Sequence, residues 1–275
     1  MEASPDPTTE PHCVFDTSTP YDDYIRADAL TRLARPRTDD PAELAFLISS
    51  QVMELWFTLL IHEWRTAVRL LAEDDLPGAM TALRRSLPTL SALNAAWQPI
   101  ARLTPAQFDS YRPALGKGSG FQSARYRELE FLLGEKSANM LKPHEGTPRA
   151  HAELTEALLA PSLHDAAVDF VQRKSAPLPQ PTRERDRTHS HPADPAIEQL
   201  WRRVYNGDDR ELIELGEVLT DIAEGFWRWR SDHLMATRRA MGSKPGTGGS
   251  AGVTWLERRA ARLVFPELWT VRTDG

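Results

Sequence analysis

The strongest constraint on the fold is an apolar stripe in the C-terminal third of the sequence. Between residues 209 and 241, apolar side chains recur every three or four positions, and the series ends at a glycine: Leu215, Leu219, Ile222, Phe226, Trp229, Ala236, Ala240 and then Gly242. This spacing places them on one face of a single long helix. Because we find no period-2 alternation, internal repeat or strand–helix–strand alternation, the sequence predicts an all-α fold.

Capping motifs predict where other helices start. Asp40-Pro41-Ala42-Glu43 combines a capping aspartate, a proline at the first helical position and a glutamate at the third, ahead of a helix to about Ala72. Thr104-Pro105-Ala106-Gln107 predicts a second capped start. Further helices are predicted over 77–103, where Pro88 should kink or break the helix, and over 121–134, 148–159, 162–173 and 254–264.

Proline content suggests the domain organisation. Residues 1–20 hold four prolines and few large apolar residues, which predicts a disordered tail. Residues 174–196 hold five prolines and many charges. This segment could divide two domains, but the part after it looks too small and one-sided to bury itself. We therefore predict a single all-α domain over 21–275, with 174–196 as a Pro-rich loop insertion.

Composition excludes several classes of function. The net charge is -6 and no basic stripe is visible, which argues against nucleic-acid binding. A single cysteine, Cys13, excludes an intrachain disulfide and a cysteine-based metal site. Charged residues interrupt the longest apolar stretches, and the acidic, Pro-rich start does not resemble a signal peptide. We expect a cytoplasmic protein without a membrane span.

Few residues suggest chemistry on their own. His233 lies in the middle of the apolar stripe, where it is either a hydrogen-bonded core histidine or a metal ligand such as a proximal haem ligand. The Gly-rich loop, residues 246–252, follows a helix and not a strand, so it is no dinucleotide motif. Its backbone could approach a carboxylate closely, or it could be a flexible connector. Arg112 could pair with a carboxylate, although such an arginine usually lies on the surface.

Taken in order, several fragments resemble the tryptophan 2,3-dioxygenase family over roughly residues 21–142 and 197–273. They are YDDY (21–24), FLISSQVMELW (46–56), LTPAQFDSYR (103–112), GSGFQS (118–123), RYRELEFLLGEK (125–136), His233, GTGGSAGV (246–253) and FPELWTVRT (265–273). Each fragment is weak alone, whereas eight in register are specific. The resemblance implies an all-α helical bundle with a haem pocket, which binds haem b and O2 and assembles as a homotetramer.

The resemblance also implies a role for individual residues. His233 matches the proximal iron ligand, and Ser119 and Gly120 match a turn near the haem edge. Phe46 matches an aromatic residue of the indole pocket. Arg112 and Thr247 match residues that hold the carboxylate and ammonium of the substrate. Tyr21 and Tyr24 match tyrosines that reach into the site of a neighbouring subunit.

Four positions depart from the family pattern, and three of them affect the predicted reaction. Ser50 stands where the family usually has histidine, Ser49 where it has glutamine, and Phe108 where it has a pocket tyrosine; Asp232 also replaces the arginine that usually precedes the proximal histidine. A hydroxyl is a poor base compared with imidazole, and it leaves more room in the pocket. We therefore expect Ser50 to act at the reaction centre and Phe108 to contact substrate.

These departures predict oxygenation at indole C2/C3 of L-tryptophan or a substituted tryptophan that stops after one oxygen atom. The product would be a 2-oxindole or hydroxylated indole of specialised metabolism, and turnover would need an external reductant. The alternative is conventional dioxygenation to N-formylkynurenine, because related indole dioxygenases also manage with serine near this place. Two further alternatives are a non-catalytic haem or tryptophan-binding protein and a helical interaction protein without a cofactor.

Overall fold

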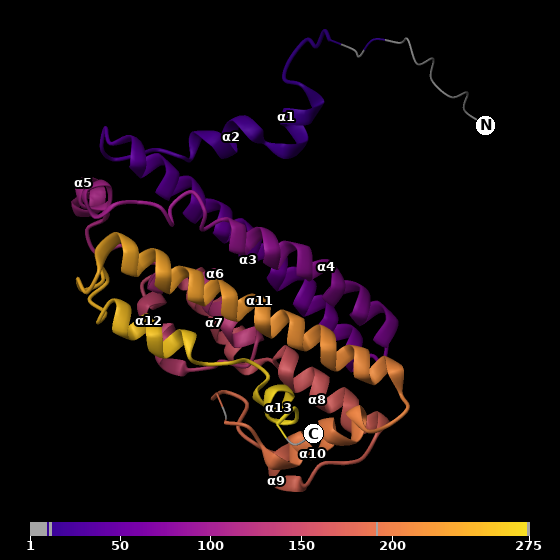
Figure 1. Ribbon diagram of the computed structural model, residues 1–275. Coiled ribbons are helices and arrows are strands. Elements are labelled where there is room, and N and C mark those ends of the chain that lie inside the picture. The colour runs from indigo at the N-terminus through magenta and orange to yellow at the C-terminus, as the bar shows by residue number, and fades with distance from the viewer. Residues whose placement is uncertain (1–9, 11–12, 191, 274–275) are drawn as a thin grey trace. The chain divides into compact units, whose positions relative to one another are not determined.

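The computed structural model describes residue 10, residues 13–190 and residues 192–273 (Figure 1). The chain divides into two compact units, Met1–Pro36 and Arg37–Gly275. The first unit contains α1 (Pro20–Ile25) and α2 (Ala27–Arg32), neither of which has a buried residue. Most of the predicted tail lies outside the described residues. The predicted start of the folded domain at residue 21 falls inside α1, whereas the division between compact units follows Pro36.

Three long helices form the core of the second unit. They are α3 (Pro41–Ala72), α4 (Leu76–Ala95) and α11 (Arg210–Met241), and α4 packs against both of the others. The predicted Asp40 cap is present: its carboxylate accepts a hydrogen bond from the Ala42 amide at 2.8 Å. The predicted glycine at the end of α11 is also present: Gly242 follows the helix with φ +57°, a backbone conformation that glycine adopts without strain.

Shorter helices surround this core. α6 (Ala124–Leu132) and α8 (Leu163–Lys174) pack on α3, while α5 (Pro105–Leu115) and α12 (Val253–Ala260) pack on α11. The remaining elements are the 3-10 helices η1 (Gly120–Gln122) and η2 (Ala138–His144) and the helices α7 (Pro148–Leu159), α9 (Gln180–Arg183), α10 (Pro195–Tyr205) and α13 (Pro266–Thr270). The described part of the chain contains no strand, which confirms the all-α prediction.

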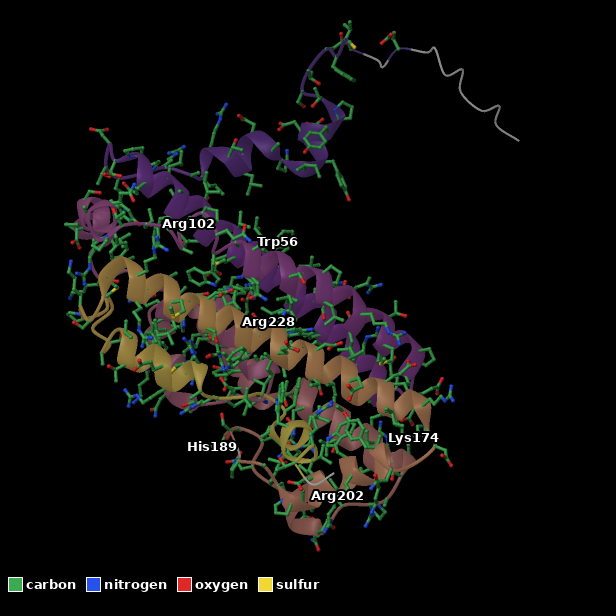
Figure 2. The ribbon with its side chains drawn as sticks, viewed as in Figure 1. Trp56, Arg102, Lys174, His189, Arg202 and Arg228 are labelled. Atoms are coloured by element: carbon green, nitrogen blue, oxygen red, sulfur yellow. The ribbon has the colours of Figure 1, made fainter. Side chains whose placement is uncertain are left out.

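The predicted stripe of α11 is the centre of the core. Leu215, Leu219, Ile222, Phe226 and Trp229 are all buried, and α3 contributes Phe57, Leu60 and Trp64 to the same cluster. By length and composition α3 is apolar enough to cross a membrane. In this fold it instead carries α4, α6 and α8 on its sides (Figure 1). Figure 2 shows the side chains along these helices, with Trp56 of α3 and Arg228 of α11 labelled.

Several local predictions differ from the structure. The helix predicted over 77–103 ends at Ala95. Pro88 does not break α4, which continues to Ala95. Pro88 and Arg84 are exposed, so the Arg84 carbonyl that the proline leaves without a donor can bind water. The Pro-rich segment 174–196 is not loop throughout, because it contains the short α9 and the start of α10. His189, labelled in Figure 2, lies between these two helices.

Candidate functional site

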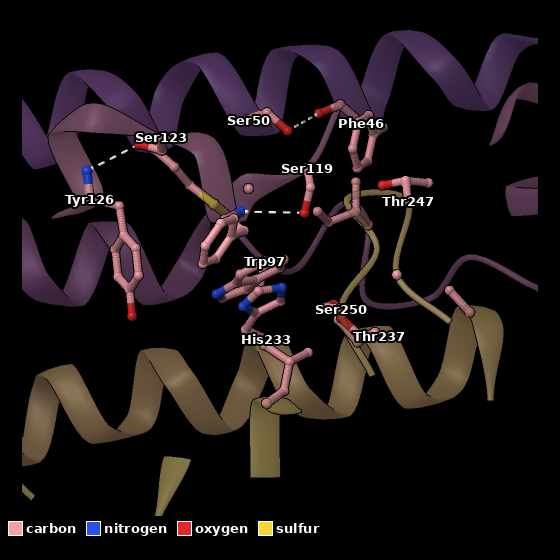
Figure 3. Close-up of a pocket in the computed structure, with 18 of the residues that line it drawn as sticks. Phe46, Ser50, Trp97, Ser119, Ser123, Tyr126, His233, Thr237, Thr247 and Ser250 are labelled. Carbon is pink, nitrogen blue, oxygen red and sulfur yellow. Dashed lines mark hydrogen bonds between the residues drawn. The ribbon is translucent and has the colours of Figure 1, made fainter. Parts of the chain in front are cut away.

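A cavity of about 450 Å³ lies in the second unit, between α3, α11, the segment that follows α5 and the Gly-rich loop. Figure 3 shows Phe46 and Ser50 extending from α3 on one side and His233 and Thr237 from α11 on the other. Seven residues selected from the sequence line it: Phe46, Ser50, Phe108, Ser119, Gly120, His233 and Thr247. These residues come from five separate segments, so the fold brings together what the sequence keeps apart.

His233 extends from α11 into an aromatic part of the cavity wall. Its ring stacks on Trp97, with centroids 4.7 Å apart and planes 14° apart, and Trp229 lies at 5.7 Å. No described residue forms a hydrogen bond or ion pair with the His233 ring. Burial lowers the pKa of His233 to about 4, so its imidazole is neutral at neutral pH. A neutral, unpartnered imidazole at a cavity wall has the chemistry of a metal ligand.

The α3 side of the cavity is mostly apolar. The Phe46 ring contacts the Tyr111 ring at 5.5 Å, and Phe108 meets Tyr111 edge-on at the same distance. The Ser50 hydroxyl donates a hydrogen bond to the Phe46 carbonyl of its own helix, at 2.8 Å (Figure 3). Ser50 therefore adds room to the cavity while its proton is directed toward the backbone. Ser49 is buried elsewhere in the packing and does not line the cavity.

The Gly-rich loop closes one side of the cavity against the turn that contains Ser119. The Thr247 hydroxyl donates to the Gly118 carbonyl at 2.5 Å. The two backbones approach so closely that a Cβ on Gly248 would lie 2.8 Å from the Ser119 Cβ. Glycine is therefore required at residue 248 by space, and the loop is a built part of the site.

Three other residues selected from the sequence do not line the cavity. Arg112 donates to the Pro245 carbonyl at 2.6 Å and so ties α5 to the residue before the Gly-rich loop. Tyr21 and Tyr24 belong to the first unit, where their exposed fractions are 68% and 88%. Their predicted roles toward the substrate remain predictions.

Sequence reasoning missed a charged part of the wall, which we call the arginine wall: Arg127, Arg230 and Arg259, with their partners Glu130 and Glu135. All three arginines line the cavity. Although burial opposes its ionisation, the three guanidinium groups lower the pKa of Glu130 to about 2. Nothing in the residue spacing indicated this cluster, because its members come from α6, α11, α12 and the turn after α6.

Two further features of the wall were also missed. Trp97, which stacks on His233, lies in the turn after α4, and no sequence pattern relates the two residues. Glu54 lines the cavity one turn after Ser50 on α3. Burial raises the pKa of the Glu54 carboxyl, against the opposing effect of Ser123 and Arg125.

The site offers one histidine to a metal. Among the described residues, no group of three or more His, Cys, Asp or Glu side chains could hold an ion directly. A group that needs a single protein ligand fits the geometry better. Haem is such a group, since one axial histidine suffices to hold its iron.

Comparisons with known proteins agree with this geometry. The family model described as tryptophan 2,3-dioxygenase matches residues 6–199 and 180–274. A tryptophan 2,3-dioxygenase of Bordetella parapertussis is 37% identical over 281 residues, which cover 98% of this chain and 99% of the relative. Enzymes of the same name from Polaromonas naphthalenivorans and Burkholderia pseudomallei are each 39% identical over 94% of this chain, covering 93% and 85% of their own lengths.

Proposed function

Because the chain belongs to the tryptophan 2,3-dioxygenase family, we propose that it adds both atoms of O2 across the indole C2–C3 bond of L-tryptophan or a close relative. That bond breaks, and the product is an N-formylkynurenine that contains every atom of the two substrates. The protein is thus an oxidoreductase. The observation that carries the proposal is the neutral, unpartnered His233 imidazole in a cavity that Phe46 lines from the opposite helix.

We propose that this cavity binds haem b through His233. Trp97 and Trp229 fix the position of the imidazole, and the aromatic lining suits a planar macrocycle. Haem held by this histidine would supply the O2 chemistry of the reaction. The chain has to orient the indole ring and keep water away from it. The apolar side chains of Phe46, Phe57 and Phe108 serve this purpose.

The amino-acid end of the substrate requires polar partners. Thr247 is in the cavity wall, and Arg112 lies beside the same loop, bound to the Pro245 carbonyl. We propose that Arg112 exchanges this carbonyl for the carboxylate of tryptophan, because a guanidinium binds a carboxylate through two charge-assisted hydrogen bonds. Ser119 and Gly120 would lie at the haem edge.

The assembly and location follow from the same family. We propose a cytoplasmic homotetramer in which Tyr21 and Tyr24 complete the site of a neighbouring subunit. Their exposure within the first unit is consistent with such a role. No feature of the site suggests a nucleic-acid or membrane partner.

Dioxygenation is better supported than the single-oxygen reaction expected from Ser49, Ser50 and Phe108. The relatives that match almost the whole chain are named dioxygenases. Of the two serines only Ser50 borders the cavity, and its hydroxyl is engaged within its own helix. Only the substitutions at Ser49, Ser50 and Phe108 therefore favour a 2-oxindole product and an external reductant.

Product analysis under labelled oxygen tests the proposal. The haem-loaded protein is incubated with L-tryptophan and 18O2, with and without ascorbate, and the products are weighed by mass spectrometry. We expect an N-formylkynurenine with two labelled oxygen atoms as the main product, with no stoichiometric consumption of reductant. A 2-oxindole with one labelled atom would restore the monooxygenase hypothesis, and a Soret band without turnover would indicate a non-catalytic binding protein.

A further inference from the structure

The arginine wall carries more positive than negative charge. Its ion pairs form a closed set: Glu130 pairs with Arg127, Arg230 and Arg259, and Glu135 pairs with the last two. Three guanidinium groups and two carboxylates leave a formal charge of +1. Because Arg127, Arg230 and Glu130 are at most 3% exposed, water does little to screen that charge.

The excess charge falls on Arg127. Arg230 is fully used, since it donates to the Tyr126 hydroxyl, to both glutamates and to the carbonyls of Arg259 and Arg262. Arg127 donates only through Nη1, to Glu130, while its Nε and Nη2 atoms are buried without a hydrogen-bond partner. The Nε of Arg259 is in the same condition.

Aromatic rings flank the Arg127 guanidinium. Its central carbon lies 5.2 Å from the Phe121 ring centroid and 4.9 Å from that of Tyr126. Both rings border the cavity, and Phe121 lies in the three-residue turn η1. Cation–π contact offsets part of the cost of burying the guanidinium, but it supplies no acceptor for the two N–H groups.

We propose that Arg127 is a carboxylate-binding residue at the arginine wall, separate from Arg112. The Nε and Nη2 edge of a guanidinium matches the two oxygens of a carboxylate, whose single negative charge would bring the wall to neutrality. Because the Nε and Nη2 atoms of Arg127 are buried, the binding that we propose requires a neighbouring side chain such as Phe121 to move aside. The inference rests on the proposed function, because that function supplies the candidate ligands. The carboxylate is either a propionate of haem b or the carboxylate of the amino acid.

Binding measurements on Arg127→Met test this role. Wild type and variant are titrated with haem b and with its dimethyl ester, which lacks both carboxylates. The haem-loaded forms are then titrated with L-tryptophan and with tryptamine, which lacks the carboxylate. Arg125→Met is the matched control, because Arg125 lies two residues earlier on α6 and pairs with Glu128 and Glu153 outside the cluster.

We expect Arg127→Met to weaken binding of one carboxylate ligand by about ten- to a hundredfold, the effect of a lost charge-assisted hydrogen bond. A loss confined to haem b and absent with its ester assigns the carboxylate to the cofactor. A loss confined to tryptophan and absent with tryptamine assigns it to the substrate. Unchanged affinity for all four ligands, in a variant that folds, overturns the proposal.

Stability measurements guard against a folding artefact. Arg127→Met removes the guanidinium in excess of the two carboxylates and leaves Glu130 paired with Arg230 and Arg259, so the melting temperature of the ligand-free protein should stay unchanged or rise. The rise in that temperature on adding the ligand should shrink relative to wild type. A variant that melts much lower without ligand shows that Arg127 is structural, and this outcome also overturns the proposal. Formation of N-formylkynurenine by the wild type tests the proposed function independently of these results.

Discussion

Two ionisable residues of the cavity wall, His233 and Arg230, lie three residues apart on α11 but differ in their charge and in their partners. His233 stands among aromatic rings without a hydrogen-bond partner, and burial keeps it neutral. Arg230, one turn earlier, is charged and bound by five acceptor groups. We call His233, with Trp97 and Trp229, the histidine wall. The difference indicates that His233 is free to bind a ligand, whereas Arg230 holds in place the helix on which His233 lies.

The arginine wall fixes α11 by joining it to two other helices. Arg230 reaches Tyr126 and Glu130 of α6, and it also binds the Arg259 carbonyl of α12. The bonds to Tyr126 and Glu130 are buried, so breaking one of them leaves a group without water to replace its partner. Changes in the histidine wall should therefore alter ligand binding, whereas changes to Arg230 or Glu130, which join the helices, should alter stability.

The largest expected effect is on the histidine wall. His233→Ala should weaken haem binding by at least about a hundredfold, because it removes the proposed iron ligand; replacing even a residue that only supports a metal ligand costs ten- to a hundredfold. Haem titration followed at the Soret band measures this loss. His62→Ala, which changes an exposed histidine of α3, should bind haem as the wild type does. Normal haem content and spectrum in His233→Ala would refute the assignment.

The next largest effect is on the arginine wall. Glu130→Gln leaves three guanidinium groups with one carboxylate, and breaking a buried pair in this way costs about 3–5 kcal/mol of the free energy of unfolding. Urea unfolding monitored by circular dichroism provides the measurement. The control is Glu257→Gln, which breaks the exposed pair with Arg238 and should cost at most about 1 kcal/mol. Equal losses in both variants would show that the wall does not hold the helices together.

The two walls also differ in how far the sequence predicted them. His233 could be found because a helical stripe surrounds it and because its neighbours fall into a family pattern. The arginine wall could not, since its members are spread over residues 127–135, 230 and 259 and show no common period. Read along the chain, such charges resemble a solvated helix face. Their burial appears only when α6, α11 and α12 are packed together.

The helix ends that the sequence predicted correctly are those marked by capping residues. The ends of α3 and α11 agree with the structure because the Asp40 cap and Gly242 are short-range signals that packing does not override. The break predicted at Pro88 is absent. The effect of a proline on a helix depends on whether the carbonyl that loses its donor is exposed to water, and this exposure depends on tertiary structure. Trp97 was overlooked because its stacking on His233 joins segments far apart in the chain.

Acid should affect the arginine wall in a defined pH window. The pKa of Glu130 is lowered to about 2 in the fold, whereas that of an unfolded glutamate is about 4.3. The stabilisation is therefore complete above about pH 4.3 and is lost as the pH falls toward 2. The difference in unfolding free energy between wild type and Glu130→Gln should shrink over this range. A difference that stays constant from pH 6 to pH 2.5 would contradict the ionised state of Glu130.

A smaller effect is expected where the Gly-rich loop meets α5. Arg112→Ala should raise the KM for tryptophan by about ten- to a hundredfold, because a charge-assisted pair with the substrate carboxylate is lost. Steady-state kinetics with tryptophan and with indole provide the comparison, and indole should be affected much less. A similar rise for both substrates would mean that Arg112 only supports the loop through the Pro245 carbonyl.

The smallest effect is predicted for substitution of Ser50, although the sequence analysis based its predicted change of reaction mainly on this residue. Its hydroxyl donates to the Phe46 carbonyl, so Ser50→Ala removes a hydrogen bond inside the helix, although the residue lines the cavity. We expect kcat/KM for tryptophan to stay within about twofold of wild type and unfolding free energy to change by at most about 0.5 kcal/mol. Phe46→Ala, one turn earlier on α3, should lower kcat/KM far more, because Phe46 packs against Tyr111 and is proposed to confine the indole ring. If Ser50→Ala instead lowered kcat more than tenfold, or changed the number of labelled oxygen atoms in the product, the hydroxyl would have to leave its carbonyl during turnover and act on the substrate.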